Sequence, residues 1–227
     1  MKDSKSFTVF LDIALALVLL TSSIAVPILC RPFYYAQIGP LGLEASTGLT
    51  EEQIKTAYDE MLDYCQGGEK FSTGVLRWSE SGKSHFTDVR FLFQLDLQVL
   101  VCTLALVTAS LLFIRRGRRR PALLLGRGPG FWAGVGLGGL FLLVGALAAL
   151  DFDRAFVAFH ALFFPGKDNW LFDPAQDQII NILPQEFFRS CAILILGLLT
   201  AGCAALIAFD LTRKRGRESR HSKLQKF

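Results

Sequence analysis

Apolar residues gather into four long runs along the chain instead of spreading evenly. A helix needs about 20 apolar residues to cross the hydrocarbon core of a bilayer, which is about 30 Å thick. The runs at residues 7–29, 91–114, 131–150 and 190–209 meet that length. The pattern therefore predicts an all-α integral membrane protein with four transmembrane helices.

Basic residues are distributed unevenly over the polar segments between these runs. Residues 115–130 hold six arginines and no acid, and residues 210–227 hold seven basic and two acidic residues. Residues 31–94 hold six basic and nine acidic residues, and residues 151–189 hold three basic and six acidic ones. Loops rich in Lys and Arg stay in the cytoplasm, so we expect both termini inside and the two acidic loops outside.

This topology divides the chain into eight segments. They are transmembrane helix 1 (1–30), an extracytoplasmic cap loop (31–90), transmembrane helix 2 (91–114), an Arg-rich cytoplasmic loop (115–130), transmembrane helix 3 (131–150), an extracytoplasmic loop with an interfacial segment (151–189), transmembrane helix 4 (190–209) and a basic cytoplasmic tail (210–227).

The first outside loop is long enough to fold into a small cap. Thr50 and Gln53 have the spacing of a capping box, and residues 54–65 carry apolar side chains at helical spacing. A helix is therefore expected there. Residues 79–84 are rich in Ser and Gly and predict a turn before the second apolar run.

The second outside loop contains an apolar stretch that is too short to cross the bilayer. Residues 155–164 are nearly all apolar, and ten residues next to a membrane indicate an interfacial or re-entrant segment. Asp173 and Pro174 then have the pattern of a helix start, which predicts a short helix to about Leu183.

The net charge of +4 does not change this interpretation. The basic clusters are explained by topology and by contact with anionic lipid headgroups, so nucleic-acid binding is not expected. Cys30 and Cys65 are the two cysteines assigned to the outside, and their spacing matches no motif. Whether they form a disulfide stays open at this point.

Glycines in the third run match a dinucleotide fingerprint at Gly134, Gly136 and Gly139. That fingerprint requires a preceding strand and an aqueous phosphate, and neither fits a transmembrane run. Small residues at four-residue spacing favour close helix packing instead. Two such stripes are predicted, one at Gly130, Gly134 and Gly138 and one at Gly197, Ala201 and Ala205.

Two of the three histidines, His85 and His160, are assigned to the outside loops, each beside an apolar run and among aromatic residues. Asp88 lies one helical turn after His85. Two histidines at one depth in separate loops suggest a joint site. The alternative is two interfacial histidines that only form hydrogen bonds. A zinc site would need the same residues, but no metal-ligand spacing supports it, so neither metal nor cofactor is expected.

At these residues the sequence resembles the bacterial lipoprotein intramolecular transacylases. The resemblance covers nearly the whole chain, and Arg90 departs from it because a lysine is more frequent at that position in the family. The segments that carry the resemblance are residues 81–90, 159–164, 169–174 and 182–188.

The resemblance implies an enzyme of the bacterial cell membrane whose active site faces outward and whose substrate is a diacylated lipoprotein. Such an enzyme moves the sn-2 acyl chain from glycerol to the α-amino group of the lipidated cysteine, which gives a lyso-form lipoprotein. We expect His85 to act as the base, oriented by Asp88, and His160 as proton donor or oxyanion partner. Arg90, Arg154 and Trp170 are expected to position the substrate.

Two other functions are compatible with parts of the sequence. A non-enzymic membrane module, whose outside cap binds a lipid or a partner protein, explains the cap but not the two outward histidines. A thiol redox protein would use Cys30 and Cys65, and it predicts that their replacement by serine abolishes function.

Overall fold

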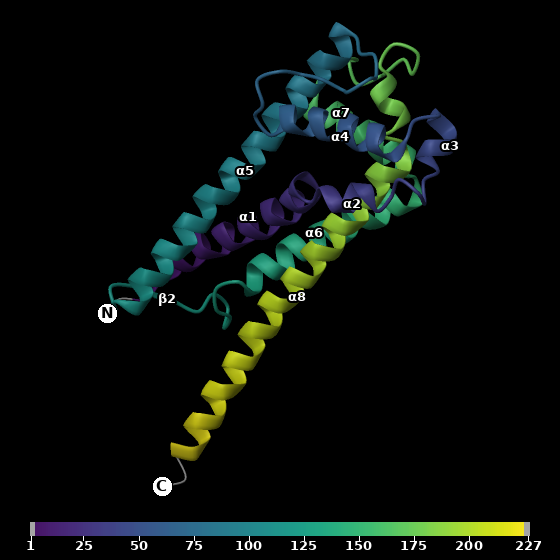
Figure 1. Ribbon diagram of the computed structural model, residues 1–227. Coiled ribbons are helices and arrows are strands. Elements are labelled where there is room, and N and C mark those ends of the chain that lie inside the picture. The colour runs from purple at the N-terminus through teal and green to yellow at the C-terminus, as the bar shows by residue number, and fades with distance from the viewer. Residues whose placement is uncertain (1–2, 225–227) are drawn as a thin grey trace. The chain divides into compact units, whose positions relative to one another are not determined.

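The computed structural model describes residues 3–224, and their side chains as far as residue 213, so His221 lies beyond the described side chains. Most of the chain is helical (Figure 1). Within these residues, four helices are long and apolar enough to cross a membrane, which confirms the predicted all-α membrane fold. They are α1 (Lys5–Leu29), α5 (Glu80–Arg115), α6 (Phe131–Leu150) and α8 (Gln185–Leu224).

Shorter elements occupy the connecting segments. They are the helices α2 (Arg31–Tyr35), α3 (Leu43–Thr47), α4 (Glu51–Cys65) and α7 (Phe152–Phe163), the 3-10 helix η1 (Gln178–Asn181), and the two-residue strands β1 (Asp3–Ser4) and β2 (Arg120–Pro121), which pair in parallel.

Two compact units make up the chain: Met1–Ser23 with Val99–Ala146 and Leu196–Phe227, and Ile24–Gln98 with Leu147–Ile195. In the first unit, the carboxylates of the buried Asp12 and the half-buried Asp210 hold the loop that precedes α6. The Gly130 amide donates a hydrogen bond to Asp12 Oδ1 (2.6 Å), and the Gly128 amide donates to Asp210 Oδ1 (2.8 Å). This loop is therefore fixed by acidic side chains of α1 and α8.

Close helix packing in the first unit depends on the glycines of α6. A Cβ atom added at Gly134 would lie 2.8 Å from the Cys203 carbonyl oxygen, and one at Gly138 would lie 3.3 Å from the Cys203 side chain. The predicted stripe on this helix thus contacts α8. The prediction that Gly197, Ala201 and Ala205 form a packing stripe on α8 is wrong, because these residues are exposed. Cys203 of α8 faces α6 instead.

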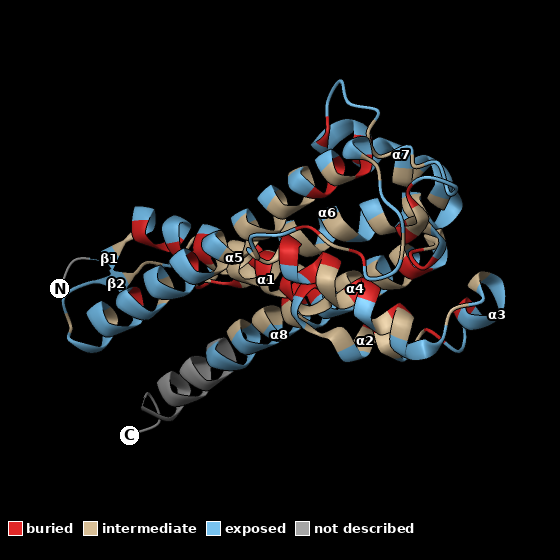
Figure 2. Ribbon diagram, turned by 45° about the horizontal axis from the view of Figure 1, so that its top comes forward, coloured by how far each residue is buried: buried red, intermediate tan, exposed pale blue. Residues whose placement is uncertain are grey.

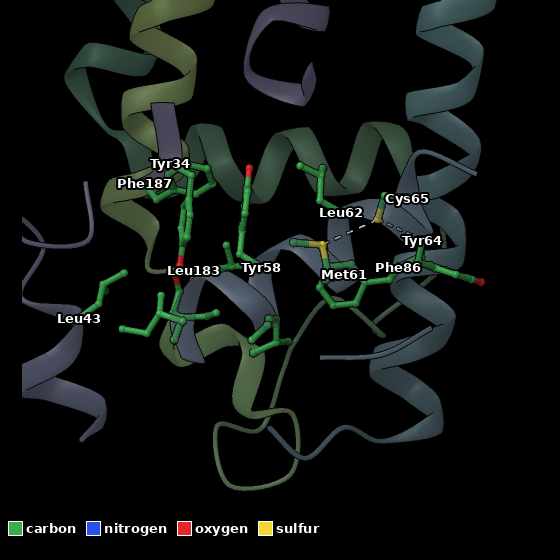
Figure 3. Packing of buried hydrophobic residues seen from close by; sticks show 14 of the residues in the cluster. Tyr34, Leu43, Tyr58, Met61, Leu62, Tyr64, Cys65, Phe86, Leu183 and Phe187 are labelled. Atoms are coloured by element: carbon green, nitrogen blue, oxygen red, sulfur yellow. Dashed lines mark hydrogen bonds between the residues drawn. The ribbon is translucent and has the colours of Figure 1, made fainter. Parts of the chain in front are cut away.

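The second unit has its own apolar core, built from α2, α4, the start of α5, the segment around η1 and the first turn of α8 (Figure 3). The inward face of α4 supplies many of its members, and Figure 2 shows the buried residues gathered on this helix. The Tyr34 ring stacks on Tyr58 at 3.7 Å between centroids, and its hydroxyl donates to the Ile182 carbonyl (2.8 Å). Thr50 and Gln53 form the predicted capping box.

Two local predictions in this unit differ from the structure. Residues 80–84 belong to the first turns of α5 instead of forming a loop turn, and Ser79 Oγ, just before the helix, accepts from the Gly82 amide (3.0 Å). Asp177 accepts from both the Ser79 amide (2.7 Å) and its hydroxyl (2.8 Å). A carboxylate from the second loop thereby fixes the start of α5, and the segment after Asp173 forms a turn and η1 in place of the predicted α-helix.

Candidate active site

His85 lies near the start of α5, before the apolar run that begins at Phe91. The helix has 36 residues and is about 54 Å long, which exceeds the hydrocarbon thickness of about 30 Å. Its first turns therefore lie outside the membrane-spanning part. The His85 side chain is only 6% exposed, and its ring centroid lies 4.9 Å from that of Phe164 and 5.4 Å from that of Phe172.

His160 lies on α7, the short helix formed by the apolar stretch of the second loop. The helix begins after Asp151, whose Oδ1 accepts from the Arg154 amide (3.0 Å) as an N-cap. His160 is 7% exposed, and Trp170 stacks on its ring at 4.4 Å. Its Nδ1 contacts the Phe156 carbonyl at 2.7 Å. Because a carbonyl only accepts, Nδ1 carries the hydrogen and Nε2 keeps a lone pair.

The two imidazoles come together, although they belong to segments 75 positions apart in the sequence. Their ring centroids are 6.0 Å apart with 31° between the planes. Phe164 packs against both rings, at 4.9 Å from His85 and 5.7 Å from His160. The pair therefore lies in an aromatic and largely water-excluded environment within the second unit.

Asp88 forms no hydrogen bond with His85 among the described contacts. Its carboxylate accepts from Lys167 Nζ (2.5 Å) and from Asn169 Nδ2 (3.1 Å). Neither Lys167 nor Asn169 was expected from the sequence to be functional. Asn169 opens one of the segments that carry the family resemblance, residues 169–174, and both residues lie between His160 and Asp173, where polar residues follow an apolar run.

The three residues expected to position the substrate have different surroundings. Arg90 donates to the carbonyls of Gly67 (3.2 Å) and Gly68 (2.5 Å) and lies over the Tyr64 ring, so its donors are used at the end of α4. Arg154 pairs with Asp151, and its side chain is 90% exposed. Of the three, Trp170 contacts the histidine pair, through its stack on His160.

Burial lowers the pKa of both histidines. For His85 burial is the main cause, the neighbouring His160 adds to it, and the Asp88 charge opposes it, which leaves a pKa of about 4. Burial also lowers the pKa of His160, against the opposing hydrogen bond to the Phe156 carbonyl. Both imidazoles are therefore neutral at pH 7 and can accept protons.

The low pKa of His85 predicts a loss of stability in acid. The unfolded chain, with a histidine pKa of about 6.5, takes up a proton between pH 6.5 and 4 that the folded chain excludes. Folding stability should therefore fall as the pH falls, by about 2 kcal/mol at pH 5 relative to pH 7.5. Reversible unfolding in mixed micelles at both pH values, compared with His85→Gln, measures this difference. An equal response of the two proteins would contradict it.

The side chains of residues 3–213 support neither metal binding nor thiol redox chemistry. No group of three or more His, Cys, Asp or Glu side chains there could hold a metal ion. Cys30 and Cys65 are both free thiols, and burial raises the pKa of Cys65 to about 12. A thiolate at Cys65 is therefore scarce at neutral pH.

Within the described residues, four helices are long and apolar enough to cross a membrane, and two buried, neutral imidazoles lie outside these four apolar runs. These features define the class of the protein: a membrane-integral protein with a candidate acid–base site. A sequence model of the lipoprotein intramolecular transacylase Lit family matches residues 9–188. The chain belongs to this family, and it is therefore an enzyme. The family name describes an acyl transfer within a single lipoprotein.

Solved structures agree with this assignment. The in meso structure of the lipoprotein intramolecular transacylase Lit from Bacillus cereus aligns with a TM-score of 0.77 and 25% identity, over 92% of this chain and 96% of that chain. Structures of the same Bacillus cereus protein with an H85R or an H85A mutation share the fold, both with a TM-score of 0.70. They are 24% and 23% identical and cover 93% and 92% of this chain and 93% and 94% of theirs. A search of curated proteins finds no match.

Proposed function

We propose that this enzyme moves the sn-2 acyl chain of a diacylglyceryl-cysteine lipoprotein to the α-amino group of the same cysteine. The product is a lyso-form lipoprotein with an amide-linked acyl chain. The observation that carries the proposed mechanism is the approach of two neutral imidazoles to 6.0 Å in a buried site. The substrate class rests on the family to which the chain belongs.

The reaction needs two proton transfers, which gives each imidazole a task. The α-ammonium must lose a proton before its nitrogen can attack the ester carbonyl carbon. After attack, the nitrogen loses a second proton as the bond between carbonyl carbon and glycerol oxygen breaks, and that oxygen gains one. One proton is thus released to solvent, and one passes from nitrogen to glycerol oxygen.

In this scheme His85 accepts the first proton, and His160 transfers the second one from nitrogen to the glycerol oxygen. His160 suits a shuttle because its Nε2 keeps a lone pair while Nδ1 is held by Phe156. A base with a pKa of about 4 is weak toward an exposed ammonium with a pKa near 8. An ammonium bound in the same apolar surroundings also has a lowered pKa, which reduces the difference.

No enzyme nucleophile takes part in this scheme. Donor ester and acceptor amine belong to one molecule, and effective molarities of intramolecular reactions can reach about 10⁵ M or more. Trp170 holds the His160 ring by stacking. The exposed Arg154 is available to a phosphate or carbonyl at the membrane surface.

We place the enzyme in the cell membrane of a bacterium, with both termini in the cytoplasm and the histidine pair outside. The arginines of residues 115–130 and the acidic excess of the other two loops support this orientation. The eight segments proposed from the sequence, including the outside cap at residues 31–90, belong to the same proposal.

The test is conversion of a synthetic diacylated lipopeptide by the purified protein. Because the transfer is intramolecular, product and substrate have equal mass, so fragmentation in the mass spectrometer must locate the acyl chain on nitrogen. We expect N-acylated product from the free amine and none from an N-acetylated lipopeptide. With a mixture of two lipopeptides that differ in acyl label and peptide, exchange of labels between them would refute an intramolecular transfer.

A further inference from the structure

We infer that the Asn169 side-chain carbonyl orients His85 by accepting a hydrogen bond from its Nδ1, so that Nε2 is the basic nitrogen. Asn169 is thereby a positioning residue for His85, the role first expected of Asp88. The inference rests on the proposed function, because Asn169 orients the residue that acts as the base in that reaction.

Two unsatisfied polar atoms carry the inference. His85 Nδ1 and Asn169 Oδ1 are both buried, and neither has a hydrogen-bond partner among the residues that the structure describes. A buried polar atom without a partner destabilises a protein by about 1–3 kcal/mol. His85 Nδ1 can carry a hydrogen and donate it, and Asn169 Oδ1 can only accept, so the two atoms are complementary hydrogen-bond partners.

The surroundings of the two atoms support their pairing. Burial has the largest effect on the pKa of His85 and lowers it, while the nearby Asn169 side chain acts in the opposite direction and raises this pKa. This is the direction expected when a carbonyl oxygen faces an imidazole N–H, because the interaction favours the protonated ring. Asn169 Nδ2 also contacts Ser84 Oγ (3.4 Å) and Asp88 Oδ2 (3.1 Å), the residue before His85 and the residue one helical turn after it. The two side chains are therefore near neighbours, although the hydrogen bond between them is not closed.

The orientation of the Asn169 amide follows from its other contacts. Asn169 Nδ2 donates to Asp88 Oδ2 (3.1 Å) and, more weakly, to Ser84 Oγ (3.4 Å). A carboxylate only accepts, so the NH₂ group must face Asp88 and the oxygen must face elsewhere. Lys167 holds the Asp88 carboxylate in turn. Asp88 thus acts on His85 through Asn169 and through its charge.

This arrangement gives both histidines the same tautomer. His160 carries its hydrogen on Nδ1, where Phe156 accepts it, and Asn169 imposes the same choice on His85. Each ring then presents a bare Nε2, which the two proton transfers require. Without Asn169, the hydrogen of His85 can move to Nε2 and remove the base.

Nitrogen NMR of the full-length protein, labelled with ¹⁵N-histidine in lipid nanodiscs, tests this directly at pH 7. Protonated and bare imidazole nitrogens have distinct shifts, and the three histidines are assigned with His160→Gln and His221→Gln. We expect a protonated Nδ1 and a bare Nε2 for His85. In Asn169→Leu we expect a mixture or the opposite tautomer, with kcat about ten- to a hundredfold lower and KM little changed.

Two further variants separate orientation from simple damage. Asn181→Leu removes another amide of the second loop, one that donates to the Pro174 carbonyl, and it should leave both tautomer and kcat unchanged. The exchange Asp88→Asn with Asn169→Asp keeps one amide, one carboxylate and a partner for Lys167. It should preserve the Nδ1–H tautomer and raise the pKa of His85, because a carboxylate now faces the ring.

A hydrogen on Nε2 in the unaltered protein, or an unchanged tautomer in Asn169→Leu, would overturn the inference. If Asn169→Leu does not fold, the spectra of the unaltered protein and of the exchange variant decide. The tautomer is read without substrate. An inactive protein with the expected tautomer therefore counts against the proposed reaction alone, and an active protein with the other tautomer counts against Asn169 alone.

Discussion

Replacing His160 with alanine should lower kcat on a diacylated lipopeptide by about a hundred- to ten-thousandfold, and replacing His85 should have an effect in the same range. Each histidine serves a separate proton transfer, so neither can substitute fully for the other. Because Nε2 of His160 is free while its Nδ1 is held at 2.7 Å from the Phe156 carbonyl, its loss removes a ready proton carrier. The measurement is the initial rate of N-acyl product formation.

The double variant provides the sharper form of this test. Residues that act as one catalytic unit are not additive, so His85→Ala with His160→Ala should be little slower than the slower single variant. His221→Ala is the matched control, because His221 is the third histidine of the sequence and is assigned to the basic tail. Normal rates in either single variant would exclude the proposed division of work between the two rings.

Tyr34→Ala should destabilise the second unit by about 3–5 kcal/mol, the range observed for loss of a buried aromatic side chain. Tyr34 is fully buried, stacks on Tyr58 and meets the edge of Phe187 at 5.1 Å. Its hydroxyl also binds the Ile182 carbonyl. One side chain thus connects α2, α4 and the segments on either side of Pro184. Reversible unfolding in mixed micelles measures the change in the free energy of unfolding.

Tyr34→Phe separates the ring from the hydroxyl. It keeps the stack and removes one hydrogen bond to a buried carbonyl, so a loss of about 1–2 kcal/mol is expected. Leu125→Ala is a suitable control, because Leu125 is 85% exposed and lies in the other unit. A destabilisation by Tyr34→Ala no larger than that of Leu125→Ala would show that the core of the second unit does not depend on this residue.

Much of the helical architecture could be predicted from the sequence because the bilayer imposes a simple rule. A crossing segment must satisfy its backbone hydrogen bonds internally, which leaves a long apolar helix as the solution for runs of this length. The capping box of α4 was equally accessible, since Thr50 and Gln53 act within one turn. Local chemistry of this kind does not depend on distant parts of the chain.

The start of α5 could not be predicted, because it depends on a contact with a distant part of the chain. Ser79 and Gly82 are turn formers by composition, but Asp177 accepts two hydrogen bonds from Ser79, about a hundred positions earlier in the sequence. Gly82 is needed there because a Cβ atom would lie 2.1 Å from Asp177 Oδ1. Contacts between distant segments outweigh local preference here, and one sequence does not reveal them.

The candidate site could likewise be predicted only in part. The joint location of His85 and His160 was inferred from residue type and expected depth, and the rings do meet. Spacing alone suggested that Asp88 would bind His85, since the two lie one turn apart. Instead, Lys167 and Asn169 of the second loop donate hydrogen bonds to the Asp88 carboxylate. Their contribution depends on where the segment after α7 folds, which spacing cannot supply.

The free thiols of Cys30 and Cys65 have a consequence for how the protein matures. Its second unit is held by packed side chains such as Tyr34 and Tyr58 and contains no covalent cross-link between those cysteines. Folding then requires no oxidoreductase and no oxidant at the membrane surface. The enzyme should reach the same folded state in cells grown with or without oxygen, and adding a reductant during purification should leave it intact.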